Sequence, residues 1–106
     1  MRIVRNNIIP FGSYIAINLF GILFCKKDAV IDGIVINHEK IHTAQMKEML
    51  YIPYYIWYGI EYLIRLVHYR NNKQAYRSIR FEIEAYANER NFCYPKYRKH
   101  YAWLKC

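Results

Sequence analysis

Two histidines four residues apart, with a glutamate directly after the first, constrain the fold more than any other feature. They lie in the segment INHEKIHTAQ, residues 36–45. On a helix, His38 and His42 project from one face, so both imidazoles can reach a single metal ion at about 2.0–2.1 Å. Glu39 lies roughly 100° around that helix from His38, badly placed for a ligand but well placed beside a metal-bound water. The pattern therefore predicts a helix that carries part of a metal site.

A catalytic zinc ion with two histidine ligands needs a third protein ligand. The segment RFEIEAYANE, residues 80–89, offers one. Glu82 and Ala85 are three residues apart and share a face of a predicted helix, and the small alanine lets that helix approach the histidine helix closely. Glu84 is the competitor, because it lies about 200° around the helix from Glu82 and only one of the two can face the metal. The alanine favours Glu82.

HEKIH followed by EIEA resembles the gluzincin metallopeptidases, and the size and layout are most similar to the minimal, one-domain minigluzincins. The resemblance covers residues 12–90 and is specific at residues 38–42 and 82–85. It implies that His38, His42 and Glu82 bind Zn²⁺ and that Glu39 is the general base and acid of peptide hydrolysis. It also implies that an edge strand pairs with an extended peptide substrate, and that the tail from residue 93 covers the cleft in a latent state.

The chain departs from the family pattern in one place. Many gluzincins have an aspartate directly after this alanine, where it orients a zinc-binding histidine, whereas this chain has Tyr86. We expect Tyr86, Glu84 or Asn37 to take that role. The candidates for stabilising the oxyanion are Arg80, Tyr76 and Tyr86.

The order of the predicted elements indicates a single α+β domain over residues 1–106. We expect a small N-terminal β-hairpin or sheet packed on about three helices, a minimal zincin-like layout. Asn18 or Gly21 supplies the bend of the hairpin, Asp32 caps the first helix, and Pro53 lies in the first turn of the second. Residues 2–9 form a basic and apolar lead-in. The predicted elements are strands within residues 11–26, helices over residues 34–50, 53–69 and 75–90, and a basic, aromatic tail over residues 91–106.

Apolar residues at helical spacing predict one apolar face on each of the two later helices. On the second helix, these residues are Ile52, Ile56, Ile60, Leu63 and Val67. The opposite, half-exposed side of that helix carries Tyr58, Tyr62, Arg65 and Tyr69. On the third helix, the predicted buried residues are Ile79, Ile83 and Ala87.

The formal net charge of +8 admits anionic partners, such as a membrane surface. No nucleic-acid-binding motif accompanies this charge, so we expect no nucleic-acid partner. Residues 8–25 carry no charge and form either strands, which their turn residues and β-formers favour, or a membrane segment. The three cysteines form no CxxC pair, which favours a reducing compartment and a cytoplasmic location, with peripheral membrane association left open.

Three functional hypotheses follow. The first is a zinc-dependent peptidase that acts on peptides or proteins. The second keeps the zinc ion as a stabilising element without catalysis. The third is a basic module that binds an anionic membrane or nucleic acid through Arg65, Arg70 and the tail. The sequence indicates neither the substrate nor the oligomeric state.

Overall fold

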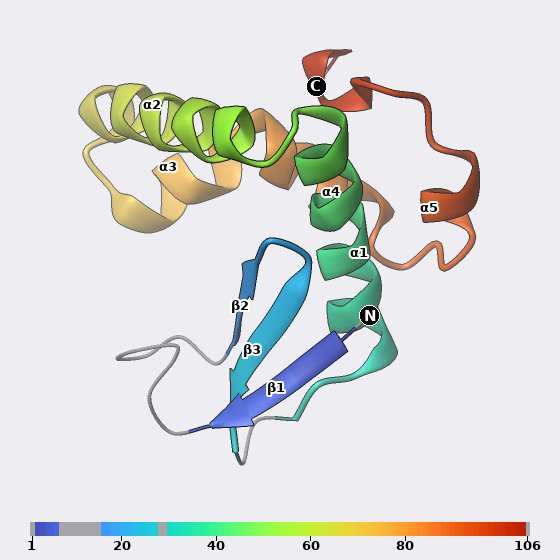
Figure 1. Cartoon of the computed structure of the whole chain (residues 1–106). Helices are drawn as coiled ribbons and strands as arrows, with labels where there is room; N and C mark the ends of the chain where they lie inside the picture. Colours follow the sequence, from blue (N-terminus) through green and yellow to red (C-terminus); the bar gives the residue numbers. More distant parts are fainter. Residues whose placement is uncertain (1, 7–15, 28–29, 106) are drawn as a thin grey trace.

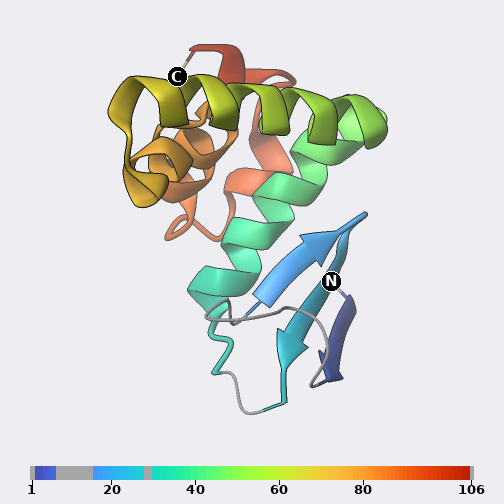
Figure 2. The ribbon, with the colours of Figure 1, turned by 90° about the vertical axis from the view of Figure 1, so that its left-hand side faces the viewer.

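A computed structural model of the chain describes residues 2–6, 16–27 and 30–105 (Figure 1). It has the predicted α+β architecture, with a small sheet and a group of helices. The sheet packs beside the first half of the long helix α1 (Gly33–Glu48), and α2 (Ile52–Tyr69) crosses beyond the other end of α1 (Figures 1 and 2). Helix α1 therefore joins the two parts of the molecule.

The three-stranded sheet has the order β1-β3-β2. Strands β2 (Ala16–Leu19) and β3 (Ile22–Lys26) form the predicted hairpin, and they are antiparallel. The two-residue turn between them has φ 53° at Phe20 and 88° at Gly21, the positive values of a tight hairpin turn. The bend is therefore at Gly21, and Asn18 lies within β2.

The prediction that residues 2–9 are only a lead-in is wrong for its first part, because Arg2–Asn6 form β1. This strand pairs in parallel with β3, so its partner is distant in the sequence and no local turn signals the pairing. The predicted strands are confirmed at residues 16–19 and 22–26. The rest of the predicted range, residues 11–15, lies outside the residues that the structure describes. Among the described residues, none of the helices combines the length and the apolar character that crossing a bilayer would require.

Helix α1 begins as predicted. The Asp32 carboxylate accepts a hydrogen bond from the backbone N–H of Val35 at 2.9 Å, which satisfies one of the free donors of the first turn. The helix ends at Glu48, and Leu50 and Tyr51 then adopt positive φ values of 59° and 64°. This corner turns the chain sharply into α2, whose first turn contains Pro53 as predicted.

The orientation of α2 is the reverse of the one that its apolar stripe predicts. Its predicted apolar residues are between 55% and 78% exposed, namely Ile52, Ile56, Ile60, Leu63 and Val67. The tyrosine side packs inward instead, with Tyr54 buried and Tyr58 and Tyr62 packed against the core. The core under α2 is itself aromatic, and Tyr54 lies 4.6 Å from Phe81 between ring centroids. Packed aromatic rings with reachable hydroxyls therefore replace aliphatic packing here.

The predicted third helix is two helices, α3 (Asn72–Ser78) and α4 (Arg80–Asn88). Ile79 separates them with an extended ψ of 132°, and its side chain is fully buried. The first N–H group of α4, on Arg80, donates to the Glu61 carboxylate of α2 at 3.0 Å. A side chain from another helix thus caps α4 and stabilises the break.

This break changes which face of α4 is buried. Ile83 is 39% exposed and Ala87 is exposed, so the predicted stripe is wrong beyond Ile79. Helix α4 buries Phe81, Glu82, Glu84 and Ala85 instead.

The tail is a structural part of the core. It forms α5 (Tyr94–Tyr97) and a short 3-10 helix, η1 (Ala102–Lys105). The indole of Trp103, only 1% exposed, lies 4.5 Å from Phe81 and 5.0 Å from Trp57 between ring centroids. Its Nε1 donates to the Glu48 carboxylate at the end of α1. Trp103 therefore joins α1, α2 and α4.

Replacing Trp103 tests this role of the tail. We expect Trp103→Ala to lower the free energy of unfolding by about 3–5 kcal/mol, because it empties the centre of the aromatic core. Leu104→Ala is the control, since Leu104 is 48% exposed and its loss should change the free energy by less than about 0.5 kcal/mol. Urea denaturation of both variants measures the difference, and equal midpoints would contradict a core role for Trp103.

Candidate metal centre

Helices α1 and α4 bring the three predicted ligands together. The Glu82 Oε1 atom lies 3.2 Å from His38 Nε2 and 3.0 Å from His42 Nε2, and the two Nε2 atoms are 3.0 Å apart. All three side chains are buried, and each offers one ligand atom within 4.8 Å of the others. These residues could hold a metal ion, and the prediction that they meet at one point is confirmed.

Glu84 lies on the other side of α4 and is part of an ion pair. Its carboxylate accepts from Arg98 Nε at 2.7 Å, from Arg98 Nη2 at 2.8 Å and from the Tyr94 hydroxyl at 2.8 Å. Burial would raise the pKa of Glu84, but the hydrogen bonds from Arg98, Gln45 and Tyr94 lower it. Glu84 therefore holds the tail to α4, and Glu82 alone of the two faces the histidines.

The outer nitrogen of each histidine has a hydrogen-bond partner that fixes the ring. His38 Nδ1 lies 3.0 Å from Glu89 Oε1, and His42 Nδ1 lies 2.8 Å from Gln45 Oε1. Both partners are acceptors, because a carboxylate cannot donate and the Gln45 amide nitrogen donates to Phe81 O and to Glu84. Each Nδ1 is therefore the donor. When such a ring carries no proton on Nε2, the Nε2 lone pair points at the other histidine and at Glu82.

This geometry places three acceptors against one another in a buried space. Two nitrogen lone pairs and a carboxylate oxygen repel one another at 3.0–3.2 Å unless a proton or a cation lies between them. Two imidazole nitrogens and one carboxylate oxygen are a ligand set that Zn²⁺ accepts in catalytic sites. The side chains that are present therefore fit a zinc ion.

Tyr58 of α2 fixes the other oxygen of Glu82. Its hydroxyl donates to Glu82 Oε2 at 2.6 Å, which leaves Oε1 directed at the histidines. Burial, followed by the charge of Glu82, raises the pKa of Tyr58 far above its ordinary value. The tyrosine thus stays a neutral donor at any physiological pH and orients the carboxylate.

Glu39 lies on α1 beside this site, and its side chain is half-buried. Burial lowers the pKa of His42, and the Glu82 carboxylate raises it. The negative charge of Glu39 makes a smaller contribution, which also raises this pKa. The backbone carbonyl of Glu39 accepts hydrogen bonds from Asn18 Nδ2 and Thr43 Oγ1, both at 3.0 Å. Asn18 belongs to β2, so an edge strand of the sheet is tied to the turn of α1 that carries Glu39.

The residues that we expected to support the site differ in whether they contact its ligands. Tyr86 packs its ring against His38, with 4.5 Å between centroids, while its hydroxyl bonds to that of Tyr76 at 3.1 Å. Asn37 donates to backbone carbonyls at the end of α4, including that of residue 89 at 2.7 Å. Arg80 lines a groove along α2 that includes none of the three ligands.

Sequence reasoning missed Gln45, Glu89 and Tyr58. Gln45 follows His42 by three residues and therefore shares its helix face, and Glu89 follows Glu82 by seven residues, or about two turns. These spacings could have identified both residues. Tyr58 comes from a helix whose orientation the sequence predicted wrongly, so no local pattern identifies it.

Comparison with known proteins adds no family assignment. The sequence matches no protein-family model and no curated protein, and the structure matches no solved structure. The gluzincin resemblance therefore depends on the two motifs and on the convergence of their side chains.

Metal binding should depend on Glu82 and not on Glu84. We expect Glu82→Gln to lower Zn²⁺ affinity by more than about 100-fold, because loss of a ligand costs more than loss of an outer hydrogen-bond partner. The matched variant Glu84→Gln should keep the affinity of the wild type, although it weakens the ion pair with Arg98. Competition with a chromophoric chelator measures both values. Zinc retention in Glu82→Gln would show that the ion is bound elsewhere.

The metal-free protein should lose stability as the pH rises. Burial alone would lower the pKa of His42, but the Glu82 carboxylate outweighs it and raises the pKa from 6.5 to about 9. The protonated His42 therefore stabilises the fold fully below about pH 6.5, and this contribution disappears as the pH rises through about 9. The shift corresponds to a loss on the order of 3 kcal/mol.

Urea denaturation with EDTA at several pH values measures this loss. Glu82→Gln is the control, because it removes the charge that raises the His42 pKa and should flatten the pH dependence. An equally steep loss in the control would assign the titration to another group.

Proposed function

We propose that this chain is a zinc-dependent peptidase of the minimal gluzincin type. The observation that carries the proposal is the convergence of His38 Nε2, His42 Nε2 and Glu82 Oε1 within 4.8 Å, with Glu39 on the same helix as the histidines. A chance HExxH sequence would not be expected to meet a buried carboxylate from a helix about forty residues later. The fixed Nδ1 tautomers of both histidines support the same conclusion.

Each group has a defined task in this proposal. A zinc ion held by His38, His42 and Glu82 would supply Lewis acidity, which would polarise the scissile carbonyl and lower the pKa of water. Glu39 accepts a proton from the attacking water and transfers it to the leaving amine nitrogen. Gln45, Glu89 and Tyr58 keep the ligands in the correct orientation. Burial, followed by the charge of Glu82, raises the pKa of Tyr76, so this neutral hydroxyl is our choice of donor to the oxyanion.

An extended peptide is the substrate that suits the sheet. Among the strands that the structure describes, the order β1-β3-β2 places β2 at an edge, where its outer N–H and C=O groups can pair with another strand. Asn18 connects this edge to the backbone of Glu39. We therefore propose that the substrate adds to β2 and that its scissile bond lies beside α1.

Cover of the cleft by the tail stays a prediction. The described contacts of the tail are with Glu84, Glu48 and the aromatic core, on the side of α4 that faces away from Glu82. Removal of residues 93–106 would also remove Trp103 from the core, so point variants test latency better than truncation.

A stabilising zinc ion without catalysis is the second candidate. The observation in its favour is burial, because His38 is 7%, His42 is 4% and Glu82 is 3% exposed. A catalytic zinc ion keeps one position open to water or substrate, whereas a structural one is closed. In this case the ion would tie α1 to α4 and contribute only to stability.

Replacement of Glu39 separates the two functions. We expect Glu39→Gln to lower peptide hydrolysis by at least about 100-fold, because it removes the proton acceptor, while Zn²⁺ affinity stays unchanged. Lys40→Gln, at an exposed neighbouring position, is the control and should retain activity. Mass spectrometry of a peptide library incubated with the zinc-loaded proteins measures cleavage.

Two results would contradict the peptidase. Cleavage by Glu39→Gln at the rate of the wild type would refute the mechanism. No cleavage by the wild type, together with a zinc-dependent rise in melting temperature, would establish the structural role instead.

A further inference from the structure

The outer face of α2 is a continuous apolar surface. We define this outer face by six residues that are all between 55% and 78% exposed, namely Ile52, Ile56, Ile60, Leu63, Ile64 and Val67. The helix lies on the outside of the molecule, with α3 and the core on its other side (Figures 1 and 2). Single exposed aliphatic side chains are common on protein surfaces. Six of them along one helix instead indicate a surface that binds another protein or a membrane.

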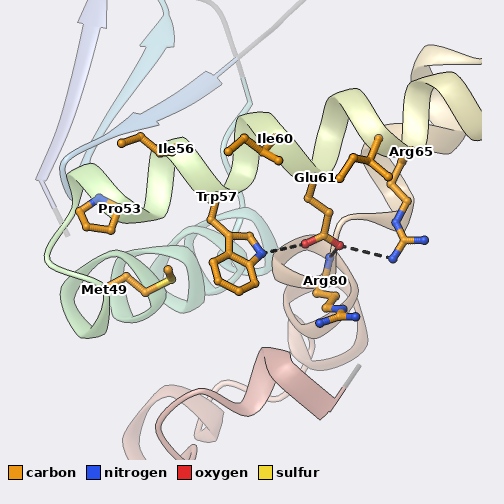
Figure 3. A pocket seen from close by; sticks show the side chains of 9 residues that line it. Met49, Pro53, Ile56, Trp57, Ile60, Glu61, Arg65 and Arg80 are labelled. Atoms are coloured by element: carbon orange, nitrogen blue, oxygen red, sulfur yellow. Dashed lines mark hydrogen bonds and ion pairs between the residues drawn. The ribbon is translucent and has the colours of Figure 1, made fainter.

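A groove of about 620 Å³ runs beside this face and is apolar at one end and cationic at the other. Its apolar part is formed by Met49, Pro53, Ile56, Trp57, Ile60 and Ile64. Arg65 and Arg80 lie together at the other end, on either side of Glu61 (Figure 3). The groove therefore suits an amphiphile with an anionic headgroup.

Glu61 does not fully neutralise these arginines. Its carboxylate accepts from Trp57 Nε1 at 3.1 Å and from the Arg80 backbone N–H at 3.0 Å, and it lies 3.6 Å from Arg65 Nη2. The buried Nε atom of Arg65 has no hydrogen-bond partner among the residues that the structure describes. The Arg65 side chain as a whole is 33% exposed, so its outer guanidinium nitrogens can bind an anionic oxygen at the mouth of the groove.

The charge of the remaining surface is almost entirely positive. Every glutamate is buried or half-buried, and most are engaged in the contacts of the α1–α4 region or in capping α4. Within the described ranges, Asp32 is the one exposed acidic side chain, and it caps α1. Most lysines and arginines are exposed. The excess positive charge, a formal net charge of +8, therefore lies mainly on the surface of the protein.

We propose that α2 docks this protein on the surface of an anionic phospholipid bilayer. The outer face of α2 enters the boundary between headgroups and acyl chains, and Arg65 and Arg80 bind lipid phosphates. Trp57 is 41% exposed and lies at the edge of the outer face. On a docked helix this edge would lie at the membrane–water interface, where tryptophan is enriched. Like charge opposes a second copy of this chain as the occupant, because both copies would present the same cationic surroundings.

Flotation of the full chain with vesicles tests the proposal. One set of vesicles contains phosphatidylcholine alone, and the other contains phosphatidylcholine mixed with phosphatidylglycerol. We expect binding to the anionic vesicles that falls with salt, persists in EDTA and is at least about tenfold weaker on neutral vesicles. Persistence in EDTA makes the result independent of the proposed peptidase function.

Two pairs of variants locate the binding surface. Ile60→Ser combined with Leu63→Ser should weaken binding by about tenfold or more, because both side chains lose apolar burial in the bilayer. Val30→Ser combined with Leu104→Ser changes two exposed apolar residues elsewhere and should bind as the wild type does. Arg80→Gln should weaken binding roughly fivefold, the effect of one basic residue at an anionic surface, and Lys96→Gln should weaken it less.

Several results would overturn the proposal. These are equal binding to neutral and anionic vesicles, no binding to either, and binding that the Ile60 and Leu63 substitutions leave unchanged. A concentration-dependent dimer in light scattering, lost in the Ile60 and Leu63 double variant, would instead show that a second copy covers the face. Unchanged circular dichroism spectra and melting temperatures would verify that the variants remain folded.

Discussion

A buried polar contact between α1 and α4 is the constraint on which the rest of the structure depends. Gln45 lies at its centre and is fully buried. Its amide oxygen fixes the His42 ring, while its amide nitrogen donates to the backbone of α4 and to Glu84. One side chain thus connects the histidine cluster to the ion pair that holds the tail. Buried polar groups are costly unless each one is paired, so this contact specifies a single arrangement of the two helices.

The parts of the fold that the sequence predicts are those that local chemistry determines. Asp32 caps α1, Pro53 begins α2 and Gly21 allows the hairpin turn, and each of these signals acts within a few residues. The break at Ile79 is different, because a carboxylate from α2 stabilises the new helix start. Strand β1 likewise pairs with a distant segment. Neither long-range contact leaves a pattern in the neighbouring sequence.

The candidate site shows the same division between local and distant information. The shared face of His38 and His42 follows from helix geometry, and the spacing of Glu89 from Glu82 could have identified Glu89 in the same way. The choice of Glu82 over Glu84 rests on Ala85 and on the gluzincin pattern. Tyr58 could not be predicted, because hydropathy places the isoleucines of α2 inside and its tyrosines outside. A tyrosine fills apolar space with its ring and also donates a hydrogen bond to a buried carboxylate. An isoleucine fills the space but cannot make this hydrogen bond. The inner side of α2 therefore supports the candidate metal centre through Tyr58, while its aliphatic residues form the opposite, exposed face.

The position of Trp103 has a consequence for how the protein is made. Ribosomes release a polypeptide from its beginning, and domains generally fold as units once their contacts are available. The indole that joins α1, α2 and α4 leaves the exit tunnel only after all three of these helices have emerged. The nascent chain therefore carries an incomplete aromatic core from the emergence of α4 until Trp103 follows it. A product that stops before residue 103 would expose that core to chaperones and to proteolysis.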